Sequence, residues 1–167
     1  MTVPPKTDVI DAVLGLDSSS PVLALRERRA KLKHFTKTSH DAALHPAEPG
    51  NFSYAMRAAL AARITGLWKA TELQAHYKAQ LEEKGSKPEL RSIADPAFRP
   101  EGDKRLATML AHVDLVTLKP KEATRANIEA LYSVGFDDRD IVTLAGLIAF
   151  VNYQVLVVAG LKMLRDN

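Results

Sequence analysis

Residues 58–77, which read AALAARITGLWKATELQAHY, decide the fold class of this 167-residue chain. Small and apolar residues recur every three or four positions on both sides of Gly66, which is the spacing of one face of an α-helix. The pattern predicts two successive helices over about 53–66 and 67–83, with Gly66 at a bend or at the junction between them.

The same helical spacing continues through most of the chain, and no stretch alternates as a strand would. The sequence therefore predicts an all-α fold. Residues 1–50 are expected to form an N-terminal helical arm, and 51–167 the main helical domain. The further helices are predicted, from their caps, Pro breaks and Gly stops, at about 7–15, 21–44, 88–94, 103–117, 124–135 and 138–164.

The last predicted helix raises the question of a membrane. Residues 141–164 are nearly all apolar and long enough to span a bilayer. Asn152 and Gln154 lie near the middle, where unpaired amides would be costly in hydrocarbon. We therefore expect a central helix rather than a membrane span, buried partly by its own domain and partly by another subunit. Small residues such as Gly146 and Gly160 would allow close helix approach.

Composition excludes several classes of protein. The chain has no Cys, so it can form no disulfide, zinc–thiolate site or thiol nucleophile. Lys and Arg number 23 against 20 Asp and Glu, a surplus too small for a nucleic-acid binder. Met1–Lys6 lack the apolar run of a secretory signal, so a cytoplasmic location is expected.

The pair Glu72 and His76 is the main candidate site. The two side chains are four residues apart on a predicted helix and so share a face. A carboxylate beside an imidazole can set its tautomer and raise its basicity, although the same spacing also suits a simple surface pair. Lys69 and Tyr77 flank the pair as candidate ligand contacts. No cofactor is predicted, and no metal site, because no third ligand or HExxH motif accompanies the pair.

The segment from residue 26 to residue 37 is rich in Arg and Lys. It fits an anion-binding surface or, more simply, a solvated helix face. His34, His40 and His45 lie on or just after it, at spacings of six and five. On a regular helix those spacings do not place all three imidazoles on one face, which argues against a metal site there.

Several stretches resemble carboxymuconolactone decarboxylase and AhpD-like alkylhydroperoxidase domains, in the peroxidase-related branch. The similarity covers roughly residues 50–164. The resemblance implies an all-α helical bundle that assembles as a homodimer, trimer or hexamer. The stretches that carry it are 58–77, His112-Val-Asp-Leu-Val-Thr-Leu-Lys-Pro, Ala123-Thr-Arg-Ala-Asn-Ile-Glu-Ala-Leu, Gly135-Phe-Asp-Asp-Arg-Asp-Ile-Val and Phe150-Val-Asn-Tyr to Ala159-Gly-Leu.

The peroxidase motif of that family is not retained. It consists of Glu, eleven residues, Cys, two residues, Cys, three residues and His. Aligned on His76, its two Cys positions fall on Lys69 and Glu72, and its Glu position falls on Arg57. A peroxidase cycle through two thiols is chemically impossible with these residues.

Three functions remain open from the sequence. The first is a small-molecule-binding or structural homo-oligomer without thiol chemistry. The second is a non-redox enzyme of decarboxylase or hydrolase type, in which Arg57 or Arg63 would hold a carboxylate beside His76 and Glu72. The third is a partner of a Cys-bearing alkylhydroperoxidase.

Overall fold

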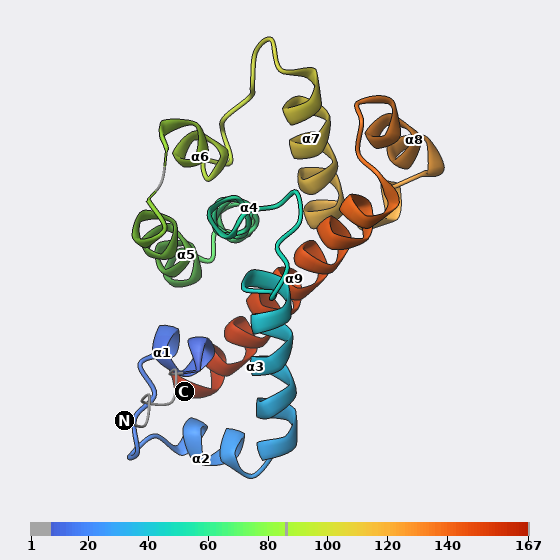
Figure 1. Ribbon diagram of the computed structural model, residues 1–167. Helices are drawn as coiled ribbons and strands as arrows, with labels where there is room; N and C mark the ends of the chain where they lie inside the picture. The colour runs from blue at the N-terminus through green and yellow to red at the C-terminus, as the bar shows by residue number, and fades with distance from the viewer. Residues whose placement is uncertain (1–7, 86, 167) are drawn as a thin grey trace.

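A computed structural model describes residues 8–85 and 87–166, so the expectation for Met1–Lys6 lies outside the described residues. Within them all regular secondary structure is helical, which confirms the all-α prediction. Helices run from end to end of the molecule, and α9 is the longest of them (Figure 1). The elements are α1 (Val9–Leu14), α2 (Pro21–Glu27), α3 (Ala30–Leu44), α4 (Tyr54–Leu67), α5 (Thr71–Glu83), α6 (Pro88–Ile93), α7 (Lys104–Leu118), the 3-10 turn η1 (Pro120–Glu122), α8 (Arg125–Ser133) and α9 (Asp138–Arg165).

The α4–α5 hairpin is the centre of the fold. Nine consecutive residues of α4, from Arg57 to Thr65, are buried. Gly66 lies where α5 and a following loop approach most closely, because a Cβ there would lie 2.3 Å from the Gln74 amide nitrogen and 2.7 Å from Pro96. The helix continues one residue past Gly66, so this glycine permits close packing rather than ending the helix.

Lys69 makes the reversal between the two helices. It has a φ of 56°, the left-handed conformation usually taken by Gly at a helix C-terminus. Its backbone N–H donates to the Gly66 carbonyl, and that of Ala70 donates to the Thr65 carbonyl, both at 2.9 Å. These two bonds form a Schellman motif and complete the hydrogen bonding at the end of α4.

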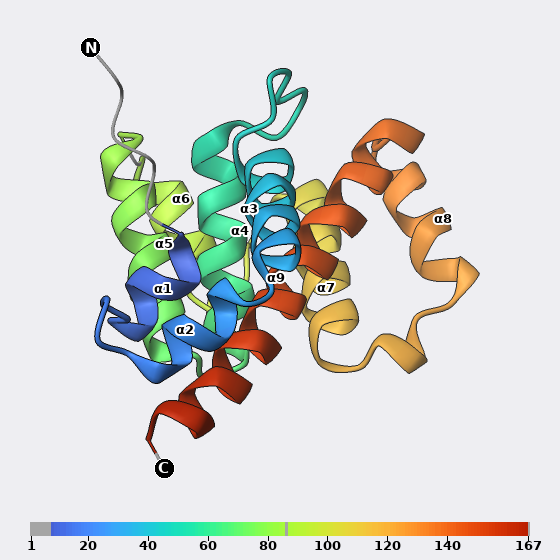
Figure 2. The same cartoon turned by 90° about the horizontal axis from the view of Figure 1, so that it is seen from below.

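Helix α9 connects the two ends of the molecule. It packs against α1, α2, α3, α4 and α7, and Figure 2 shows it running past α3 with α7 on its other side. By length and composition it is the one helix in the described part of the chain that could cross a membrane, and 44% of its most apolar window is buried. Asn152, whose amide would be costly if left unpaired, accepts from the Trp68 indole N–H of the same chain at 2.5 Å.

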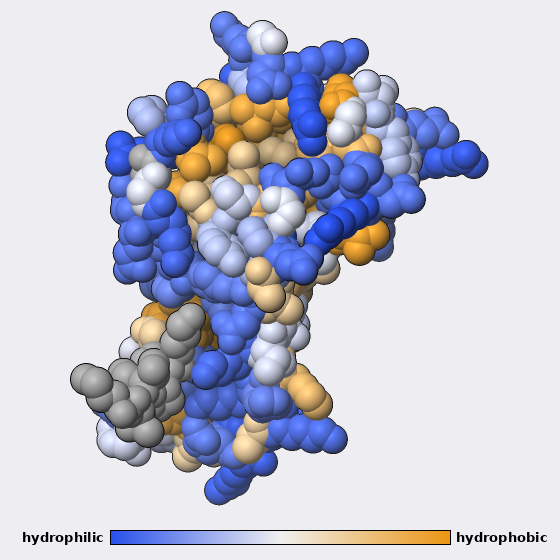
Figure 3. All heavy atoms as spheres, viewed as in Figure 1, coloured by the Kyte–Doolittle hydropathy of each residue, from blue (hydrophilic) through white to orange (hydrophobic). Residues whose placement is uncertain are grey.

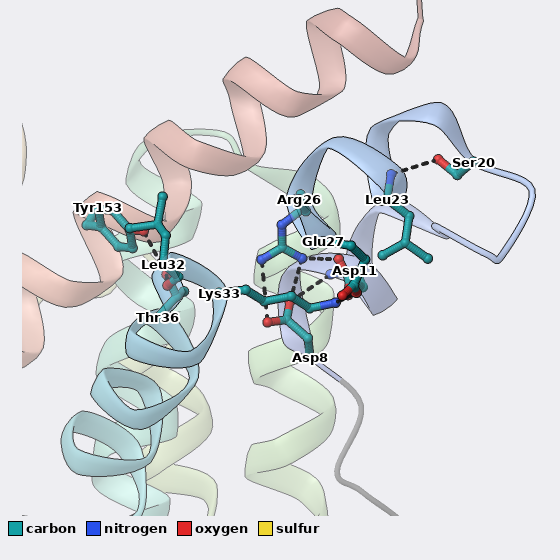
Figure 4. Close-up of polar contacts among 10 residues, drawn as sticks. All are labelled: Asp8, Asp11, Ser20, Leu23, Arg26, Glu27, Leu32, Lys33, Thr36 and Tyr153. Carbon is teal, nitrogen blue, oxygen red and sulfur yellow. Dashed lines mark hydrogen bonds and ion pairs between the residues drawn. The ribbon is translucent and has the colours of Figure 1, made fainter. Parts of the chain in front are cut away.

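The arm is held to the bundle by apolar and ionic contacts. Ile10, Leu14 and Leu44 belong to the same hydrophobic cluster as α4 and α9. The single helix expected over 21–44 is wrong, because the chain bends between α2 and α3. A straight helix would hold Arg26 and Lys33 about 10 Å apart along its axis, whereas the bend lets both pair with Asp11 (Figure 4). Part of the basic segment from residue 26 to residue 37 therefore forms ion pairs within the protein instead of a solvated surface.

Surface hydropathy is uneven. Hydrophilic residues cover most of the face in Figure 3, but hydrophobic residues reach the surface between α6 and α7. Large apolar side chains are also exposed along α9, including Val142 at 71% and Leu156 at 60%. The isolated chain thus leaves apolar surface in contact with water.

Candidate functional site

The strongest candidate site is a pocket of about 310 Å³ between the arm and α5. Three histidines, His40, His45 and His76, belong to its polar lining. It combines side chains of three helices and their flanking residues, with Gln154 of α9 at the inner end. The lining residues are Asp8, Val9, Ile10, Thr36, Lys37, His40, Asp41, His45, His76, Gln80, Glu83, Lys84 and Gln154.

His76 projects into this pocket from the middle of α5. Its Nε2 lies 3.1 Å from the Gln80 amide nitrogen, one turn further along the helix. Its ring meets the Tyr77 ring edge-on, with centroids 5.2 Å apart. Burial lowers the pKa of His76, while the Glu83 carboxylate opposes that shift. His76 is thus a neutral, half-buried imidazole at neutral pH.

His40 and His45 lie opposite His76, on the arm. Helix α3 ends at Leu44, and His45 has a φ of −134°, so its side chain leaves the helical path. The two imidazole centroids are 5.6 Å apart, and the His40 ring also packs edge-on against Phe150. The sequence argument applied regular helical spacing to His45, although the predicted helix ends at about residue 44. It therefore missed that the end of the helix brings His45 back to His40, while His34 stays exposed outside the pocket.

Burial strongly affects the protonation of His40. Its side chain is only 7% exposed. Loss of hydration, followed by the nearby His45, lowers its pKa to about 4, and Asp41 partly opposes the shift. His40 is therefore neutral across the physiological range.

Glu72 does not join His76. Its carboxylate instead accepts a hydrogen bond from Lys162 of α9, and this bond is the main reason that the pKa of Glu72 is lowered. Both side chains of that pair are largely exposed, and Glu72 does not line the histidine pocket. The predicted carboxylate–imidazole pair is therefore not formed, since the longer-range contact with α9 turns Glu72 away.

The two candidate arginines have structural partners. Arg57 is buried and donates to the backbone carbonyls of Phe52, Ala43 and Pro49 at 2.8–3.0 Å, which holds the loop between α3 and α4. Arg63 is completely buried and pairs through two nitrogens with Asp114, at 2.6 and 2.7 Å. Its remaining donors meet carbonyls of the 93–98 loop. Neither arginine lines the pocket at His76.

The two remaining candidate residues, Lys69 and Tyr77, differ in burial. Lys69 is exposed in the turn between α4 and α5, and it does not line the histidine pocket. Tyr77 is fully buried beneath His76, and its hydroxyl donates to the Gln154 side-chain oxygen. Burial raises the pKa of Tyr77. Tyr77 therefore packs beneath the pocket, and Lys69 contributes the backbone conformation that reverses the chain between α4 and α5.

These features define an all-α bundle whose arm and central hairpin enclose a histidine-lined pocket. The fold is shared with the crystal structure of an uncharacterised peroxidase-related protein from Silicibacter sp. TM1040. The two superpose with a TM-score of 0.68 at 20% sequence identity, over 78% of this chain and 68% of the other. No protein-family model and no curated protein matches the sequence. The similarity therefore establishes the fold.

Proposed function

We propose that this chain is an AhpD-like protein that acts without thiol chemistry, as a homo-oligomer that binds a small polar molecule beside His76. The histidine-lined pocket carries the proposal, because His76 is the one position at which the family's peroxidase motif is retained. The absence of Cys from the chain removes the electron-transfer step of that motif. The remaining feature is a pocket whose lining residues can form hydrogen bonds with a ligand.

The pocket lining offers hydrogen-bonding and charged groups to a small polar molecule. Neutral His76 and the Gln80 amide can donate or accept hydrogen bonds. Lys37 and Lys84 contribute positive charge to the lining, and Asp8, Asp41 and Glu83 contribute negative charge. A pocket of this size accommodates a molecule no larger than a substituted aromatic acid.

A binding role is better supported than the alternative of a decarboxylase or hydrolase. That chemistry would need Glu72 to orient His76, and an arginine to hold the substrate carboxylate. Glu72 is paired with Lys162, and the donors of Arg57 and Arg63 bond to protein groups. No specific observation favours the third possibility, a partner of a Cys-bearing enzyme.

Benzoate serves as a probe of the pocket. We expect saturable binding with a dissociation constant on the order of 1 mM, as is usual for so small a ligand. His76→Ala should weaken binding about fivefold through the loss of one hydrogen bond. NMR shifts of the imidazole resonances measure both values. His34→Ala is the matched control, since His34 is exposed outside the pocket. Benzoate binding that His76→Ala leaves unchanged would contradict the proposed site.

The homo-oligomer part of the proposal rests on the exposed face of α9. Val142, Ala149 and Leu156 are spaced seven residues apart and are all exposed. Gly146 and Tyr153 lie on the same face, and a Cβ at Gly146 would meet nothing within 4 Å. A seven-residue apolar repeat is typical of helices that pack against another helix. A second copy of α9 fits this face because small residues permit close approach.

Leu156→Glu tests this interface. We expect the unmodified chain to sediment as a dimer or larger assembly. The variant should shift to monomer, because a charge would be buried within the contact. Leu118→Glu on α7, which is also an exposed leucine, should leave the assembly unchanged. A monomeric unmodified chain at micromolar concentration would refute the interface.

A further inference from the structure

Three potential metal ligands converge at the end of α3. His40, Asp41 and His45 each offer one ligand atom, and these atoms all lie within 4.8 Å of one another. Bonds of 2.0–2.1 Å to a tetrahedral ion place ligand atoms roughly 3.3 Å apart. Modest side-chain rotation would therefore bring these three groups into coordination.

A second observation concerns the buried imidazole of His40. Its side chain is more than nine-tenths buried, and its Nδ1 has no hydrogen-bond partner among the described residues. Buried polar atoms nearly always have a hydrogen-bond partner, so we expect a ligand at this nitrogen.

The pocket supplies a further ligand and a route of entry. His76 faces the same space from α5 and is close enough to His40 and His45 to affect their electrostatics. Asp8 and Glu83 add negative charge to the lining. Two or three imidazoles with one carboxylate, in the absence of thiols, form a donor set suited to zinc and neighbouring divalent transition metals.

We propose that His40, Asp41 and His45 bind one divalent transition-metal ion of the zinc class, with His76 as the fourth ligand. This inference concerns the pocket of the proposed function and adds a metal ion to it. It assigns different roles to neighbouring histidines. The three ligands of the arm hold the ion, and His76 of α5 completes its coordination from the opposite side of the pocket. The metal would also link the arm to the bundle.

Calorimetric titration of the untagged, EDTA-treated protein with Zn²⁺ tests the proposal. We expect one equivalent to bind. His45→Ala should reduce the affinity at least about 100-fold, because even loss of an outer-shell partner costs 10–100-fold. Asp41→Asn is a second variant that preserves shape, and it should also weaken binding. His34→Ala, on the same helix, should match the unmodified protein. Circular dichroism verifies that each variant is folded.

Spectroscopy identifies the ligands directly. Co²⁺ bound in place of Zn²⁺ should show the d–d absorption of an ion held by nitrogen and oxygen, and His76→Ala should change that spectrum. Binding of Zn²⁺ that is equal in the unmodified protein, His45→Ala and Asp41→Asn would overturn the proposal, as would no binding at all.

The two proposals for this pocket fail in different ways. If EDTA-treated protein binds benzoate but never Zn²⁺, the metal inference falls and the binding pocket stands. If Zn²⁺ binds with the expected variant effects while benzoate does not, the metal site stands and the carboxylate pocket falls.

Discussion

Asp114→Ala is expected to lower the free energy of unfolding by about 3 to 5 kcal/mol, the usual cost of breaking a buried ion pair. The substitution would leave the guanidinium of Arg63 without a countercharge at a position with no solvent exposure. Arg63→Met should cost a similar amount, because it leaves the Asp114 carboxylate with only the more distant Arg99 and removes the donors that reach residues 93–98. Urea unfolding followed by circular dichroism measures both effects.

A matched control comes from an exposed pair of the same kind. Arg125 and Glu129 form an ion pair on α8, with side chains 92% and 61% exposed. Glu129→Ala should change stability by less than about 1 kcal/mol, since solvent screens such pairs. If Asp114→Ala proved as mild as Glu129→Ala, the Arg63–Asp114 pair would not be the anchor that joins α4 to α7.

Acidification is expected to destabilise the protein through His40. The imidazole has a pKa of 6.5 when solvated and about 4 in the folded chain. Between these values the unfolded chain binds a proton that the folded chain does not, so stability falls as the pH drops from about 6.5 towards 4. The loss amounts to roughly 3 kcal/mol. The groups that act on this imidazole are Asp8 before α1, Asp41 on α3, His45 at its end and His76 on α5.

The difference between two proteins isolates this effect from other titrating groups. Unfolding free energies at pH 7.5 and pH 4, in the presence of EDTA, are compared for the unmodified chain and His40→Gln. The variant should lose roughly 3 kcal/mol less over that interval. His34→Gln should keep the dependence of the unmodified chain. Equal pH dependence in all three proteins would show that His40 is not buried in its neutral form.

Most helices of the fold could be predicted from the sequence because their signals are local. The Pro breaks and Gly stops place α6 to α9 within a few residues of their observed ends. The break between α2 and α3 could not be predicted in this way. At the break, Arg26 and Lys33 both pair with Asp11, a contact that helical spacing within the segment does not reveal.

The candidate site was only partly predictable for the same reason. His76, which was chosen for its spacing from Glu72, lies in a pocket. The Glu72 pairing failed because Lys162 of the distant α9 competes for the carboxylate. His40 and His45 were dismissed on helical spacing, which ceases to apply where α3 ends at Leu44.

The sequence by itself determined that the chain is helical, that it lacks thiol chemistry, and which apolar residues each helix can bury. These properties follow from periodicity and composition, which need no knowledge of distant partners. Only the tertiary structure decided which charges neutralise one another and which histidines meet. Such choices depend on segments far apart in the chain, and their energies arise when packing removes the side chains from water.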